Sequence, residues 1–299
     1  MALLIITTIL WAFSFSLIGE YLAGSVDSYF SVLMRVGLAA LVFLPFLRTR
    51  GQSPRTIVLY MLVGAMQLGI MYLLAFRAYL YLTVSEFLLF TVFTPLYITL
   101  IYDLLSGRKL RWGYLLSAAL AVLGAAIIRY DKVSDHFWTG LLLVQLSNLC
   151  FAIGMVGYKR LMEVRPMPQH NAFAWFYVGA FIVAVAAWFM LGNAQKLPTT
   201  TLQWSVLVWL GVVASGLGYF MWNYGATQVD AGTLGIMNNV HVPAGLLVNL
   251  AIWQEQPHWP SFISAALVIL ASLWVHRRWV APHSGQTADD RRRGSAQSE

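Results

Sequence analysis

The sequence is poor in charged residues and contains a single cysteine. Only 10% of its residues are Asp, Glu, Lys or Arg, whereas soluble domains contain roughly 25%, and 59% are hydrophobic. So little charge excludes an ordinary soluble domain and indicates a membrane protein. Cys150 is the only cysteine, so no intrachain disulfide can form, and the cysteine count carries no information about redox compartment.

Signatures of enzymes and of nucleotide binding are also missing. The sequence has no H-E-x-x-H zinc motif, no P-loop, no cluster of metal ligands and no paired aspartates at a helix end that would hold magnesium phosphate. Without a P-loop, ATP cannot drive this chain directly. We therefore expect no enzymatic activity, no catalytic residues, no cofactor and no metal site.

Long apolar runs fill most of the chain. Each run of about 18–22 residues is long enough to cross a hydrocarbon core about 30 Å thick as a helix. The first run follows Met1 without a basic segment, so we expect a retained helix rather than a cleaved signal peptide. The sequence predicts an all-α polytopic membrane protein with ten transmembrane helices, at residues 2–19, 29–47, 56–76, 84–104, 113–128, 139–158, 171–191, 204–224, 231–253 and 261–276.

The net charge of +7 has a topological explanation. With a cytoplasmic N-terminus, most Lys and Arg residues fall in cytoplasmic segments, around residues 48–55, 108–111, 159–165 and 277–293. This bias follows the positive-inside rule. The basic residues therefore indicate a lipid bilayer as the surroundings, with both termini cytoplasmic, and no nucleic-acid partner.

Two halves of the chain resemble each other. Residues 72–87 align with 219–234 at an offset of 147, and Pro95 aligns with Pro243 at an offset of 148. Five helices per copy is an odd number, so the second copy enters the membrane with the opposite orientation. We predict inverted repeats at residues 1–133 and 134–280, followed by a disordered cytoplasmic tail at 281–299.

Motifs along the chain resemble the EamA-type drug/metabolite transporters. They are ILWAFSFSLIG (9–19), VLMRVGLAAL (32–41) and the paired blocks 78–110 and 225–256, and the resemblance extends to about residue 278. It implies ten helices, two inverted repeats and transport of small metabolites. The chain departs from the family at SGRKL (106–110), where many members have Gly-Glu.

The resemblance also implies a substrate. Within this family the resemblance implies biotin as the substrate, with uptake across the bacterial inner membrane by alternating access. Two alternatives remain open at this point. One is an exporter of amino acids or other metabolites and drugs, and the other is a membrane-embedded enzyme.

Charged residues inside apolar runs are candidate functional groups because burying them in lipid costs free energy. Arg35 lies about 6 residues into its predicted helix, roughly 9 Å below the membrane surface, and could bind a carboxylate or pair with Glu20 or helix-end carbonyls. Arg77 and Glu86 flank a short turn. Glu86 could exchange protons during transport, or its charge could stabilise a helix N-terminus.

The segment MNNVHVPAG (237–245) is unusually polar for mid-membrane. Pro243 removes a backbone hydrogen bond, which predicts an opened helix lining a central cavity. Its amides could bind a ureido ring, or could join neighbouring helices. The predicted substrate-binding residues are Trp11, Arg35, Tyr72, Asn148, Tyr219, Trp222, Asn223, Asn238, Asn239 and His241, and the predicted coupling or gating residues are Glu86, Arg77, Pro95 and Pro243.

Overall fold

The computed structural model describes residues 2–105, 135–229 and 231–254, with five separate positions between 263 and 274. The chain divides into two compact units, Met1–Ile101 with Val133–Gln256, and Tyr102–Lys132 with Pro257–Glu299. Almost all described residues belong to the first unit, which contains the cavity analysed below. For part of the helix beginning at Ala231, only the backbone is described. The predicted spans 113–128 and 261–276 and the predicted tail thus lie essentially outside the described residues.

Every regular element of the described chain is helical, as predicted. Their bounds are α1 Ala2–Tyr21, α2 Ser28–Phe43, η1 Leu44–Phe46, α3 Pro54–Gly64, η2 Ala65–Ile70, α4 Met71–Ala78, α5 Val84–Thr91, α6 Thr94–Leu105, α8 Asp135–Val164, α9 Gln169–Leu191, α10 Thr201–Trp209, η3 Leu210–Leu217, α11 Gly218–Ala226 and α12 Ala231–Trp253.

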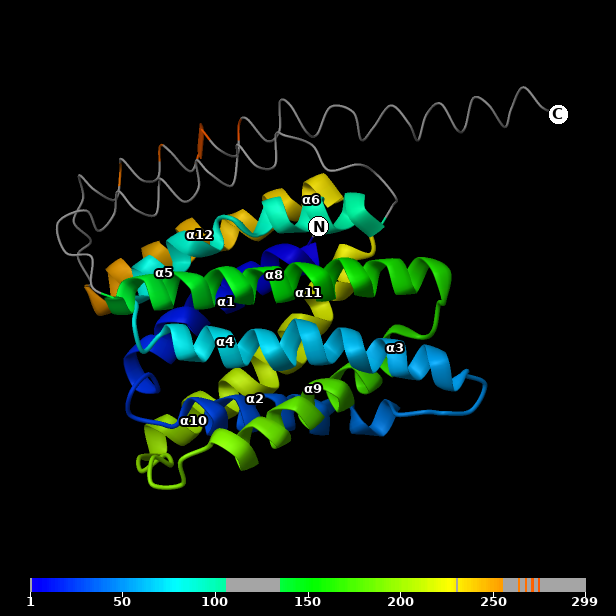
Figure 1. Ribbon diagram of the computed structural model, residues 1–299, viewed down its shortest axis with the longest axis horizontal. Helices are drawn as coiled ribbons and strands as arrows, with labels where there is room; N and C mark the ends of the chain where they lie inside the picture. The colour runs from blue at the N-terminus through cyan, green and yellow to red at the C-terminus, as the bar shows by residue number, and fades with distance from the viewer. Residues whose placement is uncertain are drawn as a thin grey trace. The chain divides into compact units, whose positions relative to one another are not determined.

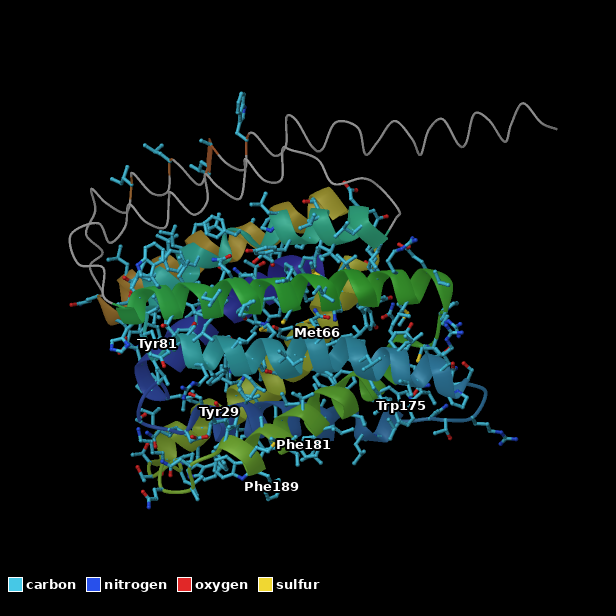
Figure 2. All side chains as sticks on the ribbon, in the orientation of Figure 1. Tyr29, Met66, Tyr81, Trp175, Phe181 and Phe189 are labelled. Carbon is cyan, nitrogen blue, oxygen red and sulfur yellow. The ribbon has the colours of Figure 1, made fainter. Side chains whose placement is uncertain are left out.

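Among the described residues, seven helical segments are long and apolar enough to cross a membrane. Their outward faces carry large hydrophobic side chains, for example Phe189, which is 82% exposed, and Phe181, both on α9 (Figure 2). Such faces are favourable next to lipid and unfavourable next to water. The predicted multi-pass character therefore agrees with the exposed surface.

Local sequence signals set where several helices begin. Asp27 caps α2 by accepting a hydrogen bond from the backbone N–H of Phe30. Thr83 and Thr200 each start a capping box, with Glu86 and Gln203 returning the reciprocal bond to the cap residue. Each box satisfies backbone N–H groups that have no partner within the helix.

Two of the long helices contain a π-helical segment. The helix Pro54–Ala78 is interrupted by η2, and the helix Thr201–Ala226 is interrupted by η3. Tyr72 and Tyr219 each follow the end of their π segment by two residues. The two interruptions thus occupy matching positions in the predicted repeats. π-Helical turns are rare and frequently occur at functional sites.

The two repeat-related prolines behave differently. Pro95 lies at the start of α6, just after the helix breaks between Thr91 and Thr94. Pro243 lies inside α12, which is continuous from Ala231 to Trp253. The prediction that Pro243 opens its helix was therefore wrong. A proline removes one backbone bond, and the surrounding turns hold the helix together.

Helices from the two predicted repeats pack against one another throughout the first unit (Figure 1). α2 contacts α9 and η3, α1 contacts α11 and α12, and α8 runs beside α4. The contact of α3 with α9 is close enough to require glycine. A Cβ atom on Gly64 would overlap the carbonyl of Phe176, and one on Gly179 would overlap that of Met61.

Candidate functional site

A cavity lies among the helices of the first unit. The volume that the centres of water molecules can occupy in it is about 90 Å³. On the same measure a single water requires ~10–15 Å³, so the cavity can hold several. It is lined by Trp11, Ser14, Phe15 and Ile18 of α1, Arg35 of α2, Met71, Tyr72, Ala75 and Phe76 of α4, Tyr79 directly after α4, Phe87 and Thr91 of α5, Thr94 of α6, Ser147, Asn148 and Phe151 of α8, Tyr219 of α11 and Asn238 of α12.

Arg35 supplies the only charged side chain in this described lining. It is 3% exposed, and its Nε donates to Ser215 Oγ at 3.1 Å while Nη2 donates to Tyr72 Oη at 2.8 Å. The guanidinium also lies over the Tyr72 ring, 4.2 Å from its centroid. These contacts use two of the five N–H donors of an arginine. The remaining donors can face a ligand.

No carboxylate in the described chain lies within ion-pair distance of Arg35. Glu20, the partner considered from sequence, is exposed to the outside of the helix bundle. The predicted alternative of a structural pair with Glu20 was therefore wrong. A buried cation held only by neutral hydroxyl groups is incompletely compensated, and it favours an anionic ligand.

The cavity wall is largely aromatic. Trp11 packs against Tyr219 with ring centroids 4.6 Å apart and against Phe151 at 6.4 Å, and Tyr219 meets Tyr72 edge-on at 5.8 Å. The indole Nε1 of Trp11 donates to the carbonyl of Ala214, which the π segment η3 presents, at 3.0 Å. This bond holds the indole ring in its place in the wall.

Asn148 lines the cavity and also donates a hydrogen bond to the backbone at the break between α5 and α6. Its Nδ2 donates to the carbonyl of Phe90 at 2.9 Å, and Gln145 Nε2 donates to the same oxygen at 3.3 Å. The hydroxyl of Thr94 donates to the next carbonyl, that of Thr91, at 2.7 Å. Side chains therefore replace the backbone donors that are lost at the Pro95 break.

Trp222 and Asn223, also predicted to bind substrate, do not line the cavity. Both are fully buried one turn further along α11 than Tyr219. Trp222 Nε1 points to Met155 Sδ at 3.2 Å. Asn223 forms a reciprocal amide pair with Gln67 of η2, at 2.9 and 3.0 Å. These contacts are typical of helix packing.

The predicted coupling or gating residues lie outside the lining as well. Glu86 is buried and accepts a hydrogen bond from the Thr83 backbone N–H at 2.9 Å, so its carboxylate caps α5. Arg77 lies over the ring of Tyr29, 5.9 Å from the centroid. The Pro243 side chain is exposed, and the side chains of Asn239 and His241 lie outside the described residues.

Sequence reasoning missed several lining residues. Ala75, Phe76 and Tyr79 were missed, although they form one stripe with the predicted Tyr72 at the spacing i, i+3, i+4 and i+7 of an α-helical face. That spacing is visible in the sequence, but apolar residues surround it on all sides. Ser215, which holds Arg35, gave no signal beyond being a polar residue inside an apolar run.

Comparison with known proteins identifies the class. The sequence profile of the EamA-like transporter family matches residues 1–130 and 138–277. The chain therefore belongs to the EamA-like transporter family, as its sequence motifs predicted. It is a multi-pass membrane transporter and not an enzyme.

Individual relatives are closely similar. The "Biotin transporter" of Escherichia coli is 83% identical over 299 residues, which is 100% of both chains. The "Probable biotin transporter" of Pseudomonas aeruginosa is 55% identical over 279 residues, covering 93% of this chain and 97% of the relative. A crystal structure with 17% sequence identity superposes with a TM-score of 0.65, covering 92% of this chain and 95% of that one. At that identity the likeness shows a shared fold alone.

Proposed function

We propose that this protein takes up biotin across the bacterial inner membrane as a secondary transporter, and that the described cavity is its substrate site. Two relatives that match over nearly their whole length are named for biotin. A biotin molecule has a carboxylate, a flexible alkyl chain and a neutral ureido ring. The cavity offers complementary groups for all three parts.

The observation that carries the proposal is the environment of Arg35. The guanidinium is buried in the cavity wall and bonded to Tyr72 and Ser215 but to no described carboxylate. Such a group binds a carboxylate through paired, charge-assisted hydrogen bonds. The alkyl chain would then contact Trp11 and Tyr219. A carboxylate-bearing metabolite fits this arrangement better than a cationic drug, which Arg35 would repel.

Alternating access between two inverted five-helix repeats would expose the cavity to each side in turn. The matching positions of η2 and η3 support two copies of one unit, and helices from both copies line the cavity. In the proposed arrangement ten helices would cross the membrane, with both termini in the cytoplasm. The π segments supply points where the helices can bend during transport.

Uptake of radiolabelled biotin into proteoliposomes containing the purified protein tests the proposal. We expect saturable uptake that unlabelled biotin competes and that amino acids do not. Preloaded vesicles should also exchange internal for external biotin, because a secondary carrier is reversible. Uptake of an amino acid in place of biotin would contradict the proposal and favour the exporter alternative. Chemical conversion of biotin by the purified protein would favour an enzyme.

A further inference from the structure

Two buried polar atoms in the cavity wall have no hydrogen-bond partner within the described part of the chain. They are Tyr79 Oη and Asn238 Nδ2. Tyr79 is 7% exposed and Asn238 is 2% exposed, so bulk water does not satisfy them either. Nearly all buried polar groups in native proteins are paired, and an exception calls for a specific explanation.

The unpaired atoms are fixed in position. The Tyr79 ring stacks on the Phe87 ring, with centroids 4.3 Å apart and an angle of 16° between the planes. The Tyr79 ring also lies beside Gly19, where Val84 fills the space that a side chain would occupy. Asn238 lies on α12, which packs against α1 and α5. The stacked Tyr79 ring therefore cannot easily turn away from the cavity to find another partner.

Tyr79 and Tyr72 occupy different levels of the cavity wall. Tyr79 follows Tyr72 by seven residues along the same helical face, which corresponds to roughly 10 Å of helix rise. Arg35 contacts the ring of Tyr72. Between the two positions the stripe contains only Ala75 and Phe76. The cavity wall therefore combines a cationic group, an apolar stripe and two neutral hydrogen-bonding groups.

We propose that Tyr79 and Asn238 form a subsite for a neutral planar head group that carries a carbonyl oxygen, namely the ureido ring of the substrate. This rests on the proposed function, and it assigns the substrate's orientation, with the carboxylate at Arg35 and the ureido ring at Tyr79 and Asn238. Asn238 Nδ2 donates to the ureido carbonyl oxygen. Tyr79 Oη can donate to the same oxygen or accept from a ring N–H. An extended biotin spans about 10 Å between these groups, given bond lengths of ~1.5 Å.

The subsite makes a prediction about stability that needs no ligand. Unpaired buried polar groups destabilise a fold, and replacing them by apolar groups of similar shape is neutral or stabilising. We therefore expect Tyr79→Phe and Asn238→Leu to leave the melting temperature of the ligand-free protein in detergent unchanged or to raise it. A structural role for either group predicts a lower melting temperature.

Matched controls are available on neighbouring helices. Asn223 is also a buried asparagine, but it is paired with Gln67, and the hydroxyl of Tyr177 donates to the Ser215 carbonyl at 2.6 Å. Asn223→Leu and Tyr177→Phe should lower the melting temperature. Neither control should alter the ratio of affinities for ligands that differ only in the head group.

The binding arm compares biotin with 2-thiobiotin, in which sulfur, a weaker acceptor, replaces the ureido oxygen, and with biotin methyl ester. The wild type should prefer biotin to both. Tyr79→Phe and Asn238→Leu should each reduce the preference over 2-thiobiotin by about tenfold, a change of ~1.4 kcal/mol, and keep the preference over the ester. Arg35→Gln should show the reverse pattern.

Each failure points to a different conclusion. If the wild type binds biotin and both subsite variants keep its preference over 2-thiobiotin, or if both variants lower the ligand-free melting temperature as the controls do, the subsite is refuted and the proposed function stands. If the wild type binds none of the three compounds, the proposed function is refuted, and the ureido assignment with it.

Discussion

Replacing Arg35 by glutamine is the most informative single perturbation of the proposed site. The substitution removes the positive charge and keeps an amide that can still hydrogen-bond to Tyr72 or Ser215. The wild-type guanidinium is buried and makes bonds of 2.8 and 3.1 Å to these two hydroxyl groups. Glutamine can therefore replace part of its structural contribution without replacing its attraction for an anion.

The magnitude follows from the bonds that the substrate would lose. A hydrogen bond to a charged group contributes about 1.5–3 kcal/mol, which corresponds to a loss of about 10- to 150-fold in affinity at ~1.4 kcal/mol per factor of ten. We expect isothermal titration to give this loss for biotin. Biotin methyl ester carries no charge, so its affinity should change by less than about threefold.

The ester distinguishes a binding role from a structural one. If Arg35→Gln distorts the cavity, biotin and its ester should lose affinity equally, and the reasoning would be refuted. Tyr72→Phe provides a second check, because it removes a hydroxyl that holds the guanidinium and leaves the ring beneath it. Its effect on biotin should be smaller than that of Arg35→Gln and in the same direction.

Three further predictions concern the elements around the cavity. Gly179→Val should lower the unfolding free energy by at least about 1–3 kcal/mol, because a Cβ there overlaps α3; unchanged thermal stability in detergent would contradict the close contact. Asn148→Leu should cost about 1–3 kcal/mol by leaving the Phe90 carbonyl without its 2.9 Å partner, and an unaltered melting temperature would show that Gln145 suffices. Glu86→Gln should retain biotin uptake at all pH values tested, because glutamine also completes a capping box; loss of accumulation would instead support proton coupling at Glu86.

The helices themselves were largely predictable from length and hydrophobicity. The predicted span 231–253 has the same bounds as α12, and 171–191 differs from α9 by two residues at its start. The lipid-facing and buried sides both require apolar residues, so long apolar runs indicate helices clearly. They do not indicate which face of each helix contacts lipid and which is buried in the protein.

The internal breaks of the helices were not predictable from local sequence. Pro95 and Pro243 look equivalent, but only the helix at Pro95 is interrupted, and two side chains from α8 donate to the Phe90 carbonyl there. The π segment η3 likewise accepts hydrogen bonds from distant residues, such as that from Trp11 to the Ala214 carbonyl. These contacts are long-range, and a single sequence does not contain them explicitly.

Intramembrane polarity was a useful but incomplete guide to the site. Arg35 and Asn238 line the cavity, whereas Asn223 is equally polar and pairs with Gln67 instead. Only the folded arrangement distinguishes an amide with a partner from one without. Tyr79 gave no signal, because 14% of the residues are aromatic and its unpaired hydroxyl becomes evident only in three dimensions.

A structure of the protein with bound biotin would test the central claim most directly. We predict that biotin lies in the cavity with its carboxylate about 2.7–2.9 Å from the Arg35 guanidinium, its alkyl chain against the aromatic wall and its ureido ring at Tyr79 and Asn238. Biotin bound elsewhere, or bound with its carboxylate away from Arg35, would contradict the account.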